Sequence, residues 1–186
     1  MGITTELPVA SYQQQPQWIT ILICVIMNIR KFHHQDTQEI MQLFYDTVHN
    51  INIRDYTPEQ VNAWAPQYMD YQRWNKHLHS KMTYVAELDG KIIGFAQLEP
   101  DGHIDCFYCH KDFQGMGVGN KLLDTLQTQA ETLGINRLFA EVSITAKGFF
   151  EHKGFEVINQ QTVERRGVKL VNYRMDKNIS SPSIGH

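Results

Sequence analysis

The sequence has few cysteines, no excess of one charge and no long apolar run. Three cysteines in 186 residues are too few for a disulfide framework, so a reducing compartment is expected. Seventeen Lys and Arg against twenty Asp and Glu give a net charge of −3, which offers no general attraction to polyanions. We therefore expect no nucleic-acid partner, no membrane partner and a cytoplasmic location.

An apolar stretch runs from Trp18 to Met27, interrupted by Thr20. As a helix, ten residues rise only about 15 Å, half the apolar thickness of a bilayer, so the stretch is too short to span one. Glu6 is the one charge before Arg30, so the basic region of a signal peptide is missing. The stretch is either an added strand or a surplus ahead of Met27. We favour the second and predict that residues 1–26 lie outside the core fold.

The rest of the chain alternates predicted strands and helices, without an internal repeat or an interdomain linker. A hydrophobic content of 42% suits one domain with a sizeable core. The segments 36–39 and 57–60 predict capping boxes at two helix starts. Strands are predicted at 27–33, 83–88, 92–98, 104–109 and 137–142 and in a final pair after Gly154, and helices at 36–51, 57–65, 67–79, 122–133 and 146–153.

This order of elements predicts an α/β (α+β) fold. Three antiparallel strands follow the first helices, and later strands alternate with helices. Such an order gives a mixed, mostly antiparallel sheet with helices on both faces.

A glycine-rich turn lies between the strand 104–109 and the next helix. Its sequence from Gln114 to Asn120 places glycines at alternate positions. Glycines leave backbone amides unobstructed at the positive end of a helix, which is a geometry that binds phosphate. The dinucleotide fingerprint would need glycine at Asn120, and the Gly-Lys-Ser/Thr of a P-loop is absent.

With this turn, the sequence resembles the GNAT superfamily of N-acetyltransferases. The family's acyl-CoA motif is Gln or Arg, two free positions, Gly, any residue, then Gly or Ala, and residues 114–119 match it throughout. Residues 149–155 resemble the second hallmark, an aromatic pair shortly before Gly-Phe. The resemblance covers residues 27–177 and leaves 178–186 as a tail. Segments 57–66 and 172–175 look most like the bacterial YafP-type branch.

The resemblance implies a function and a cofactor site. It implies transfer of acetyl from acetyl-CoA to a primary amine, on a small molecule or a peptide, by direct attack in a ternary complex. It also implies a sheet whose central strand pair splays apart, no metal, and, since dimers are common in the family, it admits a homodimer. The residues that it assigns to the cofactor are Phe107, Tyr108, Cys109, Gln114, Gly115, Met116, Gly117, Val118, Gly119, Asn120, Ser143, Phe149 and Phe150.

One position departs from the family pattern. The proton donor to the departing thiolate is usually a Tyr as second member of the aromatic pair, and here that residue is Phe150. Tyr173, Tyr108 or water would take its place, or CoA leaves as the thiolate. A catalytically weak acyl-CoA-binding regulatory or sensor module therefore stays open as an alternative.

The general base has three candidates. Alternation along a strand puts His103, Asp105, Phe107 and Cys109 on one face. His103 stands six residues before Cys109, where histone-type family members carry a catalytic Glu, and histidine suits proton transfer near neutral pH. Glu99 and Asp105 are its rivals.

Two further patterns favour ordinary structural roles. The run from Cys106 to His110 matches a haem-attachment string, but residues three apart on a strand point to opposite faces, so the two thiols should diverge. Aromatic residues between Tyr56 and Tyr84 are typical of helix core. In this family, part of that region forms the acceptor wall.

Overall fold

A computed structural model describes residues 26–179. The predicted N-terminal extension, residues 1–26, and the C-terminal tail, residues 178–186, fall almost entirely outside the described residues. No helix within residues 26–179 is both long and apolar enough to cross a bilayer.

The core is a seven-stranded sheet in the order β1-β2-β3-β4-β5-β7-β6. The pair β4 and β5 is parallel, and the other neighbouring pairs are antiparallel, so the predicted mixed, mostly antiparallel sheet is confirmed. The strands are β1 (Asn28–Lys31), β2 (Met82–Leu88), β3 (Lys91–Leu98), β4 (His103–Cys109), β5 (Arg137–Ser143), β6 (Glu156–Arg165) and β7 (Val168–Asn178).

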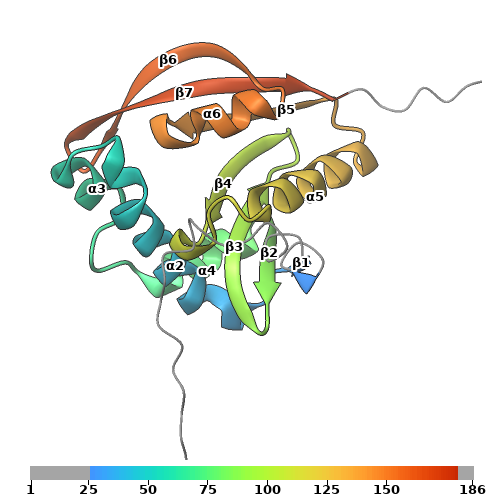
Figure 1. The fold of residues 1–186 in the computed structure, drawn as a ribbon, viewed down its shortest axis with the longest axis horizontal. Coiled ribbons are helices and arrows are strands. Elements are labelled where there is room, and N and C mark those ends of the chain that lie inside the picture. The colour runs from blue at the N-terminus through green and yellow to red at the C-terminus, as the bar shows by residue number, and fades with distance from the viewer. Residues whose placement is uncertain (1–25, 180–186) are drawn as a thin grey trace, which may run out of the picture.

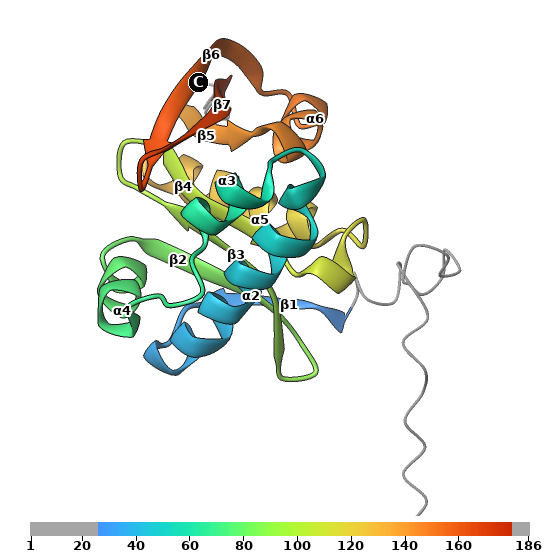
Figure 2. The same ribbon diagram turned by 90° about the vertical axis from the view of Figure 1, so that its left-hand side faces the viewer.

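Helices cover both faces of the sheet, which confirms the expected fold class (Figures 1 and 2). One face, called here the α5 face, packs against α5 (Val118–Thr132) and α6 (Ile144–His152). The opposite face, the α2 face, packs against α2 (Thr37–Asn50), α3 (Pro58–Trp64) and α4 (Tyr71–His79). Figure 2 shows α2 and α3 crossing in front of the sheet.

The two central strands separate soon after they meet. The recorded pairs between β4 and β5 are His103 with Phe139 and Ile104 with Ala140. Beyond them the strands diverge, and Figure 1 shows β4 turning away from the β5-β7-β6 part of the sheet. The expected splayed pair is therefore present, and it opens toward the glycine-rich turn.

A β-bulge interrupts β4. Between the pairs Ala96–Phe107 and Leu98–Ile104, β3 advances by two residues and β4 by three. An extra residue in one strand breaks the alternation of side chains along it. Residues before the bulge therefore change faces relative to those after it.

The bulge corrects one expectation about β4. Ile104 packs in the α5-face core together with Phe107 and Cys109, so its neighbour His103 points to the α2 face. Asp105 contacts His77 of α4 and also lies toward the α2 face. The prediction that His103 and Asp105 share a face with Phe107 and Cys109 was therefore wrong.

One of the two predicted capping boxes forms. At the start of α3, Thr57 Oγ1 accepts the Gln60 amide at 3.2 Å, and Gln60 Oε1 accepts the Thr57 amide at 2.9 Å. At the start of α2 the box is absent, because the Asp36 carboxylate accepts from Arg30 at 2.7 Å. Glu39 instead accepts an amide of β3 at 2.7 Å. Contacts with β1 and β3 therefore take the place of the predicted capping box of α2.

Candidate active site

A cleft of about 290 Å³ lies where β4 and β5 diverge. Because the strands are apart, its walls come from both faces of the sheet. Of the predicted cofactor residues, one does not line it: Met116, whose side chain is buried in the α5-face core. Those that do are Phe107, Tyr108, Cys109, Gln114, Gly115, Gly117, Val118, Gly119, Asn120, Ser143, Phe149 and Phe150.

The glycine-rich turn forms one end of the cleft. Gly117 has a φ of +81°, a backbone conformation that side chains disfavour, and α5 begins at the next residue. The side-chain amide of Gln114 donates to the Cys109 carbonyl at 2.7 Å and so fastens the turn to the end of β4. The first amides of a helix have no partner within the helix and carry its positive dipole end.

This end of the cleft attracts anions through backbone groups alone. Among the residues that the structure describes, no Lys or Arg side chain lines the cleft. Gly117, Val118, Gly119 and Asn120 do line it, at the helix N-terminus. Phosphate oxygens bound here would meet amide hydrogens rather than cationic side chains.

Packed aromatic rings form the wall on the α5 face. Phe107 lies 5.4 Å from Phe150 and 5.6 Å from Phe149, measured between ring centroids. Phe150 also contacts Phe155 at 5.0 Å and is only 2% exposed. Phe150 therefore packs in the core beside the cleft and offers no proton.

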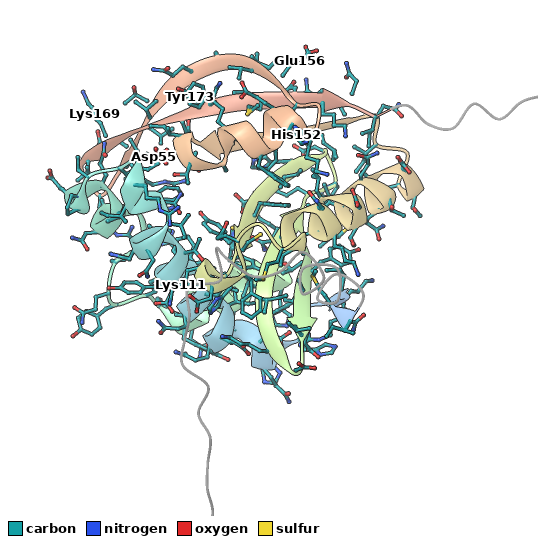
Figure 3. The ribbon with its side chains drawn as sticks, in the orientation of Figure 1. Asp55, Lys111, His152, Glu156, Lys169 and Tyr173 are labelled. Atoms are coloured by element: carbon teal, nitrogen blue, oxygen red, sulfur yellow. The ribbon has the colours of Figure 1, made fainter. Side chains whose placement is uncertain are left out.

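The two tyrosine candidates for the acid differ in position. Tyr173 does not line the cleft; it packs beside α6, with the Lys147 ammonium 5.3 Å from its ring (Figure 3). Tyr108 does line it, and its hydroxyl oxygen faces the indole N–H of Trp64, which is placed to donate to it. Burial raises the pKa of Tyr108 well above its ordinary value, so it remains a protonated phenol at neutral pH.

The three base candidates belong to one polar network on the α2 face. The Lys81 ammonium lies 2.7 Å from Glu99 Oε1 and also contacts Asp105. Glu99 Oε1 is 3.0 Å from His103 Nδ1, and Asp105 Oδ2 is 3.0 Å from His77 Nε2. Lys81 and His77 were missed in the sequence because neither is near the candidates along the chain or part of a motif.

Within this network, one base candidate faces the cleft. Asp105 lines it, whereas Glu99 and His103 do not. The second ring nitrogen of His103 lies 2.6 Å from Glu141, and its ring stacks on Phe139 at 4.9 Å. His103 is thus held at the closed end of the strand pair.

Both carboxylates of the network are held ionised. Burial would raise the pKa of Asp105, but hydrogen bonds from His77 and Lys81 outweigh it and leave the pKa well below its usual range. The same balance, with hydrogen bonds from Lys81 and His103, lowers the pKa of Glu99. A carboxylate with a lowered pKa is a weak proton acceptor but a good partner for an ammonium ion.

The network brings metal-ligating atoms together in two overlapping groups. In each group these atoms lie within 4.8 Å of one another, and the Lys81 ammonium already contacts two of the carboxylates. The predicted absence of a metal stays a prediction. The groups are His77, Asp105 and Cys106, and Glu99, His103 and Asp105.

The two described thiols lie on opposite faces, as alternation predicted. Cys106 packs in the α2-face core and Cys109 in the α5-face core, and both are free. Burial raises the pKa of Cys109 to about 12 and that of Cys106 further. Neither is an activated thiolate, since that requires a lowered pKa.

A second, smaller cavity of about 90 Å³ adjoins the cleft on the α2 face. Three residues line both spaces: Trp64, Tyr108 and Ser143. Tyr56 braces this region, since its hydroxyl donates to the Val171 carbonyl at 2.7 Å and accepts the Ile144 amide at 2.9 Å. We call this cavity the side pocket.

A splayed strand pair with an amide-lined cleft at a helix N-terminus is the architecture of acetyltransferases that use acyl-CoA. The comparison with protein families agrees. The chain belongs to the GNAT acetyltransferase family, whose domain model, "Acetyltransferase (GNAT) domain", matches residues 52–177.

Similar proteins extend over most of the chain. The uncharacterized N-acetyltransferase YafP of Escherichia coli K12 is 31% identical over 149 residues, covering 80% of this chain and 94% of that protein. A crystal structure of a GCN5-related N-acetyltransferase from Rhodopseudomonas palustris has 32% identity and a TM-score of 0.79, covering 82% of this chain and 95% of that one. The PaiA N-acetyltransferase of Thermoplasma acidophilum, solved with coenzyme A, has 17% identity, a TM-score of 0.67 and coverages of 82% and 99%.

Proposed function

We propose that this acetyltransferase transfers acetyl from acetyl-CoA to a primary amine by direct attack in a ternary complex. The observation that carries the proposal is the pair of adjoining cavities. The cleft opens at the glycine turn, the side pocket opens on the α2 face, and both share the wall formed by Trp64, Tyr108 and Ser143. Two substrates can therefore approach one another through the gap in the sheet.

The cofactor occupies the cleft in this proposal. Amides between Gln114 and Asn120 hold the pyrophosphate, and the backbone near Cys109, at the end of β4, binds the pantetheine arm in place of the missing strand partner. PaiA, which shares the fold, was solved with coenzyme A. A backbone amide beside the gap polarises the thioester carbonyl and stabilises the oxyanion that forms.

Tyr108 is our proposed acid for the departing thiolate. It carries a phenolic proton at neutral pH and lines both cavities. Phe150 has no proton to give, and Tyr173 lies outside both linings. General acid catalysis of this kind contributes about 10²- to 10⁴-fold.

Asp105 is our proposed contact for the incoming amine. Its carboxylate stays ionised and lines the cleft, so it can hold an ammonium group near the gap. The ammonium releases its proton to solvent before the attack, and the network behind Asp105, which runs through Lys81 and Glu99 to His103, keeps the Asp105 carboxylate ionised. His103 thus takes part as the far end of the network.

The acceptor class and the setting complete the proposal. The acceptor is an amine on a small molecule or a peptide. We propose a cytoplasmic location, because cells make and use acetyl-CoA internally. A homodimer stays a prediction.

Release of CoA tests the function. Wild type and Gly117→Glu are assayed with acetyl-CoA and a panel of primary amines, with free thiol measured by a chromogenic disulfide. We expect wild type to release CoA with at least one amine and the variant with none. Tight acetyl-CoA binding without turnover on any amine would instead support a sensor module, the alternative that Phe150 motivates.

A further inference from the structure

The side pocket carries a positive charge that has no role in the proposed acetyl transfer. Arg165 is the one Lys or Arg among the described residues that lines either cavity. It is the last residue of β6 and pairs with Val168 across the hairpin. Val163, two residues earlier on the same strand face, also lines the pocket.

Arg165 has no partner of opposite charge within residues 26–179. The neighbouring Arg166 donates to the Ala63 carbonyl at 2.6 Å, and Arg174 lies 3.7 Å from Glu141 and from Asp176. No such contact is recorded for the Arg165 guanidinium in the described part of the chain. A guanidinium left free beside a pocket is a ready binding group for an anion.

The guanidinium charge acts on the interior of the pocket. Burial raises the pKa values of Tyr108 and Cys106, and the positive charge of Arg165 is among the groups that oppose this rise. Both are residues of the α2-face core around the gap. Arg165 is exposed as a residue but lines the side pocket, so its charge lies near these two side chains.

A hydrogen-bond acceptor lies at the other end of the pocket. Asn172 lines it, and Asn172 Oδ1 is buried without a hydrogen-bond partner among residues 26–179. Asn172 pairs with Ser143 across β5 and β7, at the wall that the pocket shares with the cleft. An N–H group entering there would satisfy this oxygen.

We propose that the acceptor is a primary amine that carries a carboxylate several bonds away, and that Arg165 binds this carboxylate. The inference rests on the proposed function and names its substrate class. The guanidinium fork matches a carboxylate in a bidentate geometry. The amine end passes Asn172 and reaches the gap beside Asp105.

The size of the side pocket limits the distance between the amine and the carboxylate of the acceptor. Asn172 and Val168, the partner of Arg165, are four residues apart on β7, or about 13 Å along a strand. The Arg165 side chain covers part of this distance. The remainder fits an extended chain of a few carbons, so we expect an ω-amino acid. At about 90 Å³ the pocket holds a small terminal group.

Matched acceptors test the inference. The full-length protein with acetyl-CoA is assayed with 5-aminopentanoate and with 5-aminopentanamide, which differ in the charged end alone. A charged hydrogen bond is worth enough for wild type to favour the carboxylate by about 10- to 100-fold in kcat/KM. Arg165→Gln should reduce this ratio to below about threefold, chiefly through KM. Arg165→Glu should favour 1,5-diaminopentane over 5-aminopentanoate.

Lys169→Gln is the matched control. Lys169 lies on the same hairpin, is exposed and does not line the pocket (Figure 3), so its loss should leave the ratio as in wild type. Equal kcat/KM for both acceptors in wild type, or an unchanged ratio in Arg165→Gln, would overturn the inference while leaving acetyl transfer intact.

Product binding separates this inference from the proposed function. N-acetyl-5-aminopentanoate is titrated while the intrinsic tryptophan fluorescence is followed, to which Trp64 in the pocket lining contributes. Weaker binding to Arg165→Gln than to wild type supports the carboxylate site even if no amine is turned over. Equal affinity in both proteins contradicts it.

Discussion

The two sides of the gap between β4 and β5 are built in different ways. On the glycine-turn side, backbone amides of a short continuous segment line the cleft, without a cationic side chain among the described residues. On the α2 face, the side pocket is assembled from residues of α3, β4, β5, β6 and β7 together with Tyr56. A backbone site is fixed by the fold, whereas a side-chain site can change one residue at a time. The first suits a constant cofactor, and the second a variable acceptor.

The largest effect should come from breaking the backbone site. Gly117→Glu places a side chain at φ +81° and a negative charge among the amides, so we expect acetyl-CoA affinity to fall more than 100-fold by calorimetry. Gly134→Glu is the control, because Gly134 has a φ of +71° at the other end of α5. If both variants bind equally well, the glycine turn does not hold the cofactor.

Removing the Tyr108 hydroxyl tests the proposed proton donor in the wall that the cleft and the side pocket share. Tyr108→Phe should lower kcat about 100-fold and change KM for acetyl-CoA little, because the proton donor is lost while the ring remains. Tyr71→Phe, at an exposed tyrosine, should behave as wild type. A kcat within threefold of wild type would assign thiolate protonation to water.

Within the polar network, Asp105 lies at the cleft and His103 lies behind it, so substitutions at the two positions should differ in effect. Asp105→Asn should lower kcat/KM for the amine about tenfold, because Asp105 lines the cleft. His103→Gln should have a smaller effect, because His103 lies behind Glu99. Steady-state kinetics with a fixed amine measure both. The reverse order would make His103 the group that receives the proton directly.

The same network predicts an acid-sensitive part of the stability. The lowered pKa of Asp105 stabilises the fold at pH values above the ordinary 3.8, and this contribution is lost as the pH falls toward the lower value. Lys81→Met removes one cause of the shift. Its free energy of unfolding in urea should therefore fall below that of wild type at pH 7, with a smaller difference at pH 3.

Two results would count against this account of stability. In the control Lys76→Met, an exposed lysine of α4 is removed and no such pH dependence is expected. A difference between wild type and Lys81→Met that grows toward pH 3 would contradict the role assigned to Lys81.

The smallest effect on rate is expected from restoring the family's tyrosine. Phe150→Tyr adds a hydroxyl to a ring that is 2% exposed among other aromatics, so the protein should lose about 1–3 kcal/mol of stability. We expect kcat to change less than threefold in the steady-state assay. A tenfold rise in kcat would show that a hydroxyl at position 150 can still donate a proton to the departing thiolate.

Features set by neighbouring residues could be predicted from the sequence. The Thr57 box, the succession of strands and helices along the chain and the position of the glycine turn all depend on residues close along the chain. The predictions that failed concern residues whose positions depend on contacts with other strands. Asp36 bonded to Arg30 instead of capping α2, and a bulge formed by pairing with β3 turned His103 to the opposite face.

The acceptor side was hardest to predict for the same reason. Lys81 holds Glu99 and Asp105 together from the start of the β2 region, and Arg165 reaches the gap from a hairpin whose sequence contains no motif. Only the tertiary fold brings these side chains together, so periodicity and spacing carry no signal of them.

The short contact between β4 and β5 has a consequence for motion. Two recorded residue pairs join the strands directly, so the amides of β4 and β5 that face the gap beyond these pairs have no strand partner there. In deuterated water, we expect these amides to exchange faster than those of β7, which pairs with β5 on one side and β6 on the other. A cofactor that bridges the gap would slow this exchange and connect the two parts of the sheet. Without the cofactor, we expect the two parts to move relative to one another about the pairs formed by His103 and Ile104.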